Sequence, residues 1–260
     1  MRFSNTIALE RSDMPLFNFN GIFSKSALAA NADSGALERA KASSPVKTVF
    51  NSQATMYGRL KDWDVGKFVP VAEGAGVYYG GWQGWLTDEG VSQFDADRSC
   101  GVAASSNTLC YMARHAPGRS ALYTKPDLSR KSYSAFQKDI FEFISPKAWG
   151  VPTVDILIGR VLKYAESRKV KITPHKVDSG WNIDTVRPYL SNALNDDKPV
   201  MLLTWNSPIK DLQMHWVTVT AYYKDGTEKI LTSNWGGKVE YDFTTWFGGN
   251  SLYKGLIYFD

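Results

Sequence analysis

Apolar residues recur every three or four positions along four stretches of the chain, which is the spacing of one buried helix face. The first of these stretches follows Ser99 and stops at Pro117-Gly118, a strong breaker of regular structure. The last contains Pro188, which a helix tolerates because it lies near the beginning. The pattern predicts helices over Val102–His115, Ser134–Ile144, Thr153–Arg168 and Asp184–Leu194.

The pattern changes towards the carboxyl end, where apolar runs and alternation of apolar with polar residues are typical of strands. Lys224-Asp225-Gly226-Thr227 separates two of these runs and is typical of a hairpin turn. Because helices come first and an antiparallel sheet follows, the predicted fold class is α+β. Strands are expected at Val170–Thr173, Pro199–Trp205, His215–Tyr223, Lys229–Asn234 and Leu252–Phe259.

The first 50 residues are polar and rich in small side chains, which favours a flexible extension over a packed core. One short helix is expected there, over Ala36–Ala42. The extension is interpreted either as a loose terminus or as a secretion or docking segment. Residues 51–260 then form the folded domain, with short strands and loops up to residue 98.

The composition of 260 residues, 43% apolar with a net charge of +4, suits one sizeable core. The charge is spread out without a Lys/Arg block, so no nucleic-acid partner is expected. No run of 18 apolar residues would span a membrane. Charges near the amino end replace the apolar core of a signal peptide. The expected location is therefore outside the cell by a route without such a signal, or the cytoplasm.

Cys100 stands at the predicted start of the first helix, in the sequence Ser99-Cys100-Gly101. Ser99 is expected to cap the helix, because its hydroxyl can accept an N–H of the first turn. The thiol would then sit at the positive end of the helix dipole, which favours the thiolate. Cys110 is ten positions further along the same helix, about 15 Å away, so no disulfide is expected.

A thiol nucleophile needs a base, and the chain has three histidines. His115 lies at the far end of the Cys100 helix, about 20 Å away, and is expected to cap it. His175 follows a proline in a polar segment and is interpreted as a surface residue. His215 begins a strand and is left as the candidate base.

The predicted hairpin brings Asn234 level with His215, so its side chain could accept a hydrogen bond from the imidazole. The two arms differ by a few residues, which a longer turn or a bulge would absorb. Trp235 would shield that hydrogen bond from water.

Cys-Gly at a helix start, then His-Trp-Val-x-Val-x-x-Tyr, then Asn-Trp-Gly, resembles the papain-like cysteine peptidase superfamily. The resemblance covers residues 90 to 260 and is strongest to bacteriocin-processing and effector-type bacterial members. It implies a Cys-bearing helix packed on a carboxyl-terminal antiparallel sheet. It also implies a triad of Cys100, His215 and Asn234, no cofactor, a protein or peptide substrate, and a role as a secreted effector or toxin.

In that family a glutamine about six residues before the cysteine helps to hold the oxyanion. Gln93 lies seven before Cys100, one more than the family pattern, and is the matching position here. The backbone N–H of Cys100 would be the second donor.

The segment Gly74–Trp85 is dense in glycine and aromatic residues. Such a loop can line a groove, or its rings can plug the edge of the core. Trp82, Trp85 and Trp235 are the candidate substrate contacts.

Other functions remain open at this stage. The same site could deamidate glutamine, act as a transglutaminase or cleave peptidoglycan amides, and a mildly basic surface suits an anionic wall polymer. A non-catalytic binding module is a further alternative. A metal site is not expected, because the chain has no HExxH or paired CxxC motif. The oligomeric state is not predicted.

Overall fold

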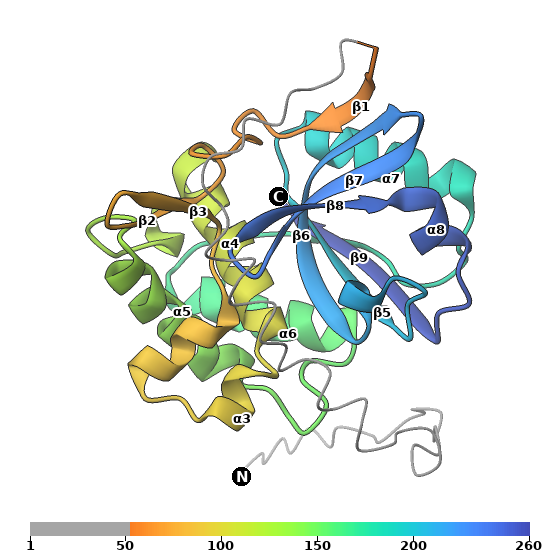
Figure 1. Cartoon of the computed structure of the whole chain (residues 1–260). Coiled ribbons are helices and arrows are strands. Elements are labelled where there is room, and N and C mark those ends of the chain that lie inside the picture. Colours follow the sequence, from red (N-terminus) through yellow and green to blue (C-terminus); the bar gives the residue numbers. More distant parts are fainter. Residues whose placement is uncertain (1–52) are drawn as a thin grey trace, which may run out of the picture. The chain divides into compact units, whose positions relative to one another are not determined.

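The computed structural model describes residues 53–260, so the expected extension and its helix at Ala36–Ala42 lie outside the described part. Within 53–260, helices dominate the first half of the chain and strands the second. Figure 1 shows α3, α4, α5 and α6 to the left and the sheet to the right. The predicted α+β class is confirmed.

The central sheet has seven strands in the order β4-β9-β5-β6-β7-β8, with β1 paired to β6. Every strand pair in it is antiparallel, as predicted. β5 pairs with the first half of β6 and β1 with the second half, so both lie along the same edge of that strand. The strands are β1 (Thr55–Arg59), β4 (Pro174–Val177), β5 (Val200–Trp205), β6 (His215–Asp225), β7 (Thr227–Asn234), β8 (Gly237–Asp242) and β9 (Tyr253–Phe259).

A second, two-stranded sheet is formed by β2 (Pro70–Glu73) and β3 (Gly76–Tyr79). It leads directly into the short helix η2 (Gln83–Glu89). The backbone N–H of Tyr79 donates to the carbonyl of Gly236 at 2.8 Å. This bond connects the small sheet to the turn that follows β7.

The four predicted helices are confirmed to within a few residues as α4, α5, α6 and α7. Thr153 caps α6, since its side chain accepts from the backbone N–H of Ile156 at 3.4 Å. The strand predicted at residues 170–173 is wrong in position, because the strand that pairs with β9 runs over 174–177, and Thr173 exchanges two backbone hydrogen bonds with Asp260 just before it. The helices are α3 (Gln93–Ala96), α4 (Cys100–His115), α5 (Arg130–Ile144), α6 (Val154–Ser167), α7 (Ile183–Asn195) and α8 (Phe243–Gly248), with η3 (Ser120–Leu122) and η4 (Lys210–Leu212).

Helix α4 is the buried centre of the fold, since every residue from Cys100 to Met112 is buried. Its small residues allow the sheet to approach closely: a Cβ added at Gly101 would lie 3.4 Å from the Trp216 ring. The Thr218 hydroxyl donates to the carbonyl of Ala104 at 3.3 Å and ties α4 to β6. The fold therefore fixes the start of α4 against the start of β6, where the candidate triad lies.

The two cysteines are free and buried. Within the described residues, the helices are too short or too polar to cross a membrane.

Candidate active site

Helix α4 starts at Cys100, but Ser99 does not cap it. The Ser99 hydroxyl donates instead to the carbonyl of Asp95 at 2.7 Å. The capping prediction is wrong because α3 ends three residues earlier, and its last turn uses the hydroxyl.

The Cys100 sulfur is only slightly accessible, with 7% of the residue exposed. The backbone N–H groups of Trp216, Gly101 and Cys100 itself lie near enough to the sulfur to lower the pKa of the thiol. Trp216 directly follows His215 in the chain, so this contact brings the sulfur to the residue next to the candidate base. The Trp216 indole in turn donates to the carbonyl of Val151 at 2.8 Å, which fixes the strand at this point.

His215 and Asn234 meet as the hairpin predicted. The Nε2 atom of His215 lies 2.7 Å from Oδ1 of Asn234, and both residues are buried. A register shift between Val219 and Ala221 absorbs the mismatch between the two arms of the hairpin, as expected. Because Asn Oδ1 accepts only, Nε2 carries the proton and Nδ1 keeps its lone pair.

Trp235 packs beside this pair, with its ring centroid 5.0 Å from that of His215. Trp235 therefore covers one face of the His215 ring. Trp235 and Gly236 both have positive φ, 50° and 73°, as required at the two central positions of a tight hairpin turn. Met214, just before His215, also has a positive φ of 48°. A bulky residue held in that conformation stores strain of the kind that clusters at functional sites.

The expected thiolate is not favoured in this closed site. Burial raises the pKa of Cys100 to about 11, outweighing the three N–H groups that lower it. Burial also lowers the pKa of His215 to about 4, against the opposing effects of Asn234 and Asp211. The prediction overlooked desolvation, which disfavours both charged forms. In this resting state burial therefore favours a neutral thiol at Cys100 and a neutral imidazole at His215.

Gln93 is exposed on α3, and its amide donates to the Asp97 carboxylate at 2.7 Å. Gln83, in contrast, is buried, with 6% of the residue exposed. The Gln83 amide donates to the backbone carbonyl of Asp97 at 3.1 Å, three residues before Cys100. Gln83 is thus the glutamine whose amide is anchored beside the start of α4. No sequence signal marks Gln83, because η2 and α3 separate it from Cys100.

Trp85 is a core residue, so its assignment as a substrate contact is wrong. It is 1% exposed and packs edge-on against Tyr78 and Tyr133, at centroid distances of 4.9 and 6.2 Å. Trp82 is half-buried, and its Cβ lies 3.7 Å from the position of a Cβ added at Gly236. Trp82 therefore stands beside the turn that holds Trp235.

The other two histidines and the second cysteine lie away from this site. His115 ends α4, stacks on Tyr111 with centroids 4.2 Å apart, and has Nε2 3.5 Å from the Asp62 carboxylate. His175 is half-exposed and bonds through Nε2 to Asp260 at 2.7 Å, in line with its assignment to the surface. Cys110 is fully buried in the core.

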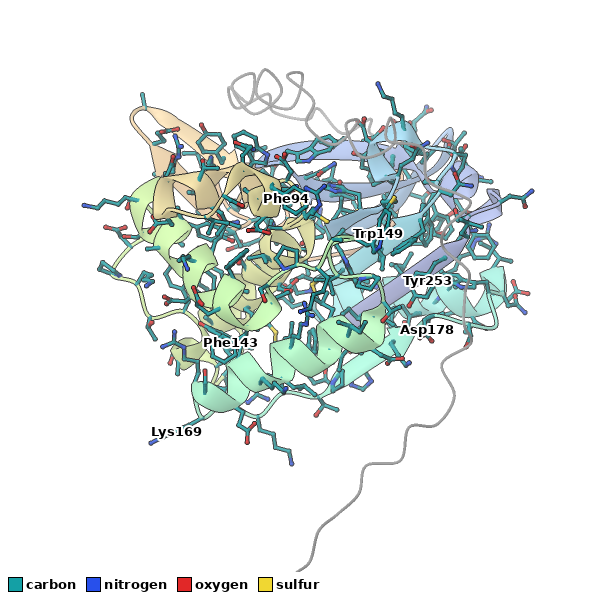
Figure 2. The ribbon with its side chains drawn as sticks, turned by 90° about the horizontal axis from the view of Figure 1, so that it is seen from below. Phe94, Phe143, Trp149, Lys169, Asp178 and Tyr253 are labelled. Carbon is teal, nitrogen blue, oxygen red and sulfur yellow. The ribbon has the colours of Figure 1, made fainter. Side chains whose placement is uncertain are left out.

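Two exposed aromatic residues flank the start of α4. Phe94 on α3 is 57% exposed, and Trp149, in the loop before α6, is 38% exposed. Arg98 connects their segments: its guanidinium lies 3.5 Å from the Phe94 ring centroid, and its Nε donates to the carbonyl of Ala148 at 3.1 Å. Figure 2 gives the view from below with Phe94 and Trp149 labelled.

A cavity of about 340 Å³ lies at the opposite end of α4, lined by His115, Arg119, Asp197, Lys198 and other residues. It is separated from Cys100 by the length of the helix. Within residues 53–260, no cluster of three or more His, Cys, Asp or Glu side chains could hold a metal ion. The chemistry available at the start of α4 is that of a thiol, an imidazole and two carboxamides.

Comparison of the chain with protein-family models, with curated proteins and with solved structures found no match. Its function must therefore be inferred from the geometry of the site.

Proposed function

We propose that this chain is a papain-like cysteine peptidase that hydrolyses peptide bonds with Cys100, His215 and Asn234. The observation that carries the proposal is the His215–Asn234 hydrogen bond of 2.7 Å, formed next to the Trp216 N–H that contacts the Cys100 sulfur. A buried nucleophile, a base and a group that orients the base are the parts that thiol catalysis requires.

Acylation begins from the neutral pair. Nδ1 of His215 takes the thiol proton while the Cys100 sulfur attacks the carbonyl carbon of the scissile peptide. The resulting tetrahedral intermediate collapses, the C–N bond breaks, and the imidazolium gives its proton to the leaving amine. A thioester remains on Cys100.

Deacylation uses the same groups in the reverse sense. His215 takes a proton from water, the hydroxide attacks the thioester carbonyl, and the C–S bond breaks. The sulfur regains a proton from the imidazolium, and the carboxylic acid product leaves. Asn234 holds the imidazole in one orientation throughout.

The oxyanion of both intermediates needs two donors aimed at one point. The backbone N–H of Cys100, at the amino end of α4, is one. The Gln83 amide is the other, because it carries two hydrogens and uses one on Asp97. This assignment replaces Gln93, whose amide is exposed on α3 and bonds to a carboxylate there.

The test is the loss of peptide hydrolysis in Cys100→Ala, measured on a mixture of denatured protein substrates by mass spectrometry of the products. Cys110→Ala is the matched control, because it removes the other buried thiol of the same helix. His215→Ala should also abolish turnover, and Asn234→Ala should reduce it less, because Asn234 only orients the base. Full activity of Cys100→Ala would overturn the proposal.

The products distinguish the related reactions. Chain cleavage at new peptide termini supports the peptidase. A mass gain of about one dalton at glutamine without cleavage would assign a deamidase, and release of peptides from purified cell-wall sacculi would assign an amidase. A Cys100 that a thiol-reactive probe labels no faster than Cys110 would favour a binding module.

A further inference from the structure

We infer that Asn107, on α4, is a positioning residue that sets the place of the Gln83 oxyanion donor relative to the triad. The inference rests on the proposed peptidase function and extends it to a residue that touches neither substrate nor nucleophile. Asn107 is 2% exposed and lies seven positions after Cys100 on α4.

The Asn107 side chain joins three separate parts of the site. Its Oδ1 accepts from the backbone N–H of Gly81 at 2.8 Å, two residues before Gln83. Its Nδ2 donates to the Ser233 hydroxyl at 3.0 Å, one residue before Asn234. One amide therefore fixes the loop of Gln83 and the strand of Asn234 to the helix of Cys100.

Neighbouring groups hold this amide in turn. The Tyr133 hydroxyl donates to the same Oδ1 at 2.6 Å, and the Ser233 hydroxyl donates to the carbonyl of Tyr79 at 2.5 Å. All of these residues are buried or form backbone contacts in the core. A buried and satisfied network of this kind rigidifies the elements that it connects.

The Gly80-Gly81 backbone is shaped to fit against this network. Gly80 has a positive φ of 80°, and a Cβ there would lie 2.5 Å from the Ser233 hydroxyl and 2.8 Å from the Asn107 amide. A Cβ at Gly81 would lie 2.3 Å from the Tyr133 ring. The loop can approach Asn107 only because neither position has a side chain.

Gln137 provides a contrast at the same place. It is fully buried, and a Cβ at Gly81 would lie 2.9 Å from its amide nitrogen, yet its two amide atoms have no hydrogen-bond partner within the described residues. Gln137 therefore borders the loop without holding it, which makes Gln137→Met a local control.

The closing experiment compares two reactions of Cys100 in Asn107→Ala and Tyr133→Phe. Peptide hydrolysis forms an oxyanion, whereas alkylation of the sulfur by iodoacetamide does not. We expect kcat for hydrolysis to fall at least tenfold in Asn107→Ala and a few-fold in Tyr133→Phe, because small displacements of a donor are costly. KM and the alkylation rate should stay within about twofold of wild type.

Two further variants serve as controls. Tyr164→Phe removes another fully buried hydroxyl, which donates to the carbonyl of Leu122 at 2.9 Å away from this network, and should keep the wild-type kcat. Gln137→Met should do the same. If Asn107→Ala does not fold, Tyr133→Phe carries the test.

Hydrogen exchange at the Gly81 amide supplies a readout that does not depend on activity. The exchange should be slow in the wild type and at least tenfold faster in Asn107→Ala. Unchanged exchange, an unchanged kcat, or alkylation that falls in parallel with hydrolysis would overturn the inference. These outcomes differ from a failure of the proposed function, because in that case the wild type itself would show no hydrolysis that depends on Cys100.

Discussion

His215 makes the stability of the fold sensitive to mild acid. Its pKa is lowered from 6.5 to about 4, first of all because burial disfavours the imidazolium. As the pH falls below 6.5, the unfolded chain binds a proton at this histidine while the folded chain resists it. The free energy of unfolding therefore decreases between about pH 6.5 and pH 4, and the contribution is fully present above 6.5.

The two pKa values give the size of the effect. Between pH 7 and pH 5, the linkage amounts to about 2 kcal/mol. His215→Gln removes the titration but can still donate a hydrogen bond to Asn234 from its amide. Carboxylates whose pKa is lowered, such as Asp64 and Asp242, contribute equally to both proteins and cancel in the comparison.

The assay is urea denaturation of both proteins at pH 7 and pH 5, followed by tryptophan fluorescence. The wild type should lose about 2 kcal/mol more than His215→Gln over this interval. His175→Gln is the control, since it removes a half-exposed imidazole that is also bonded through Nε2. Equal losses in the wild type and His215→Gln would refute the assignment of a buried neutral imidazole.

Three further outcomes test other parts of the site. Gln83→Ala should lower kcat for peptide hydrolysis about 100-fold, whereas Gln93→Ala should leave it within twofold of wild type; the reverse order would restore Gln93 as the oxyanion donor. Trp85→Ala should reduce the free energy of unfolding by about 3 to 5 kcal/mol in chemical denaturation, because it empties a core site. Trp82→Ala should chiefly raise KM for the peptide substrate. Equal stability of the two variants would contradict the burial of Trp85. Alkylation of Cys100, followed by mass spectrometry, should accelerate as the pH rises past 9 towards the raised pKa of about 11, and a plateau below pH 7 would instead show a resting thiolate.

The contacts that local pattern controls could be predicted from the sequence. Helical periodicity located α4, alternation located β6, and the turn signal located the returning strand β7, so the meeting of His215 with Asn234 followed from counting along one hairpin. That contact depends on neighbouring strands and on a turn whose Gly226 has a positive φ of 70°. Predicting such a contact requires only the two strands and the turn that joins them.

The site residues that the sequence did not predict have a different cause, because tertiary packing decides which polar side chains face the site. Spacing from Cys100 favoured Gln93, yet Gln93 is exposed on α3 and Gln83 is buried in η2. Asn107 looks like a polar interruption of an apolar helix until Gly81 and Ser233 are seen against it. No spacing rule predicts these contacts, because each joins separate elements.

The error in the expected charge of Cys100 has the most consequence for mechanism. A helix amino end offers part of a positive charge, which stabilises a thiolate modestly. Burial disfavours the thiolate and acts in the opposite direction. Here burial is the largest cause of both shifts, on Cys100 and on His215. Any movement that admits water or substrate to the sulfur weakens both shifts together. It moves the two pKa values towards each other and lowers the energy of the proton transfer. For the proposed peptidase, a movement that opens the site would therefore also activate Cys100, because burial is the largest cause of both shifts.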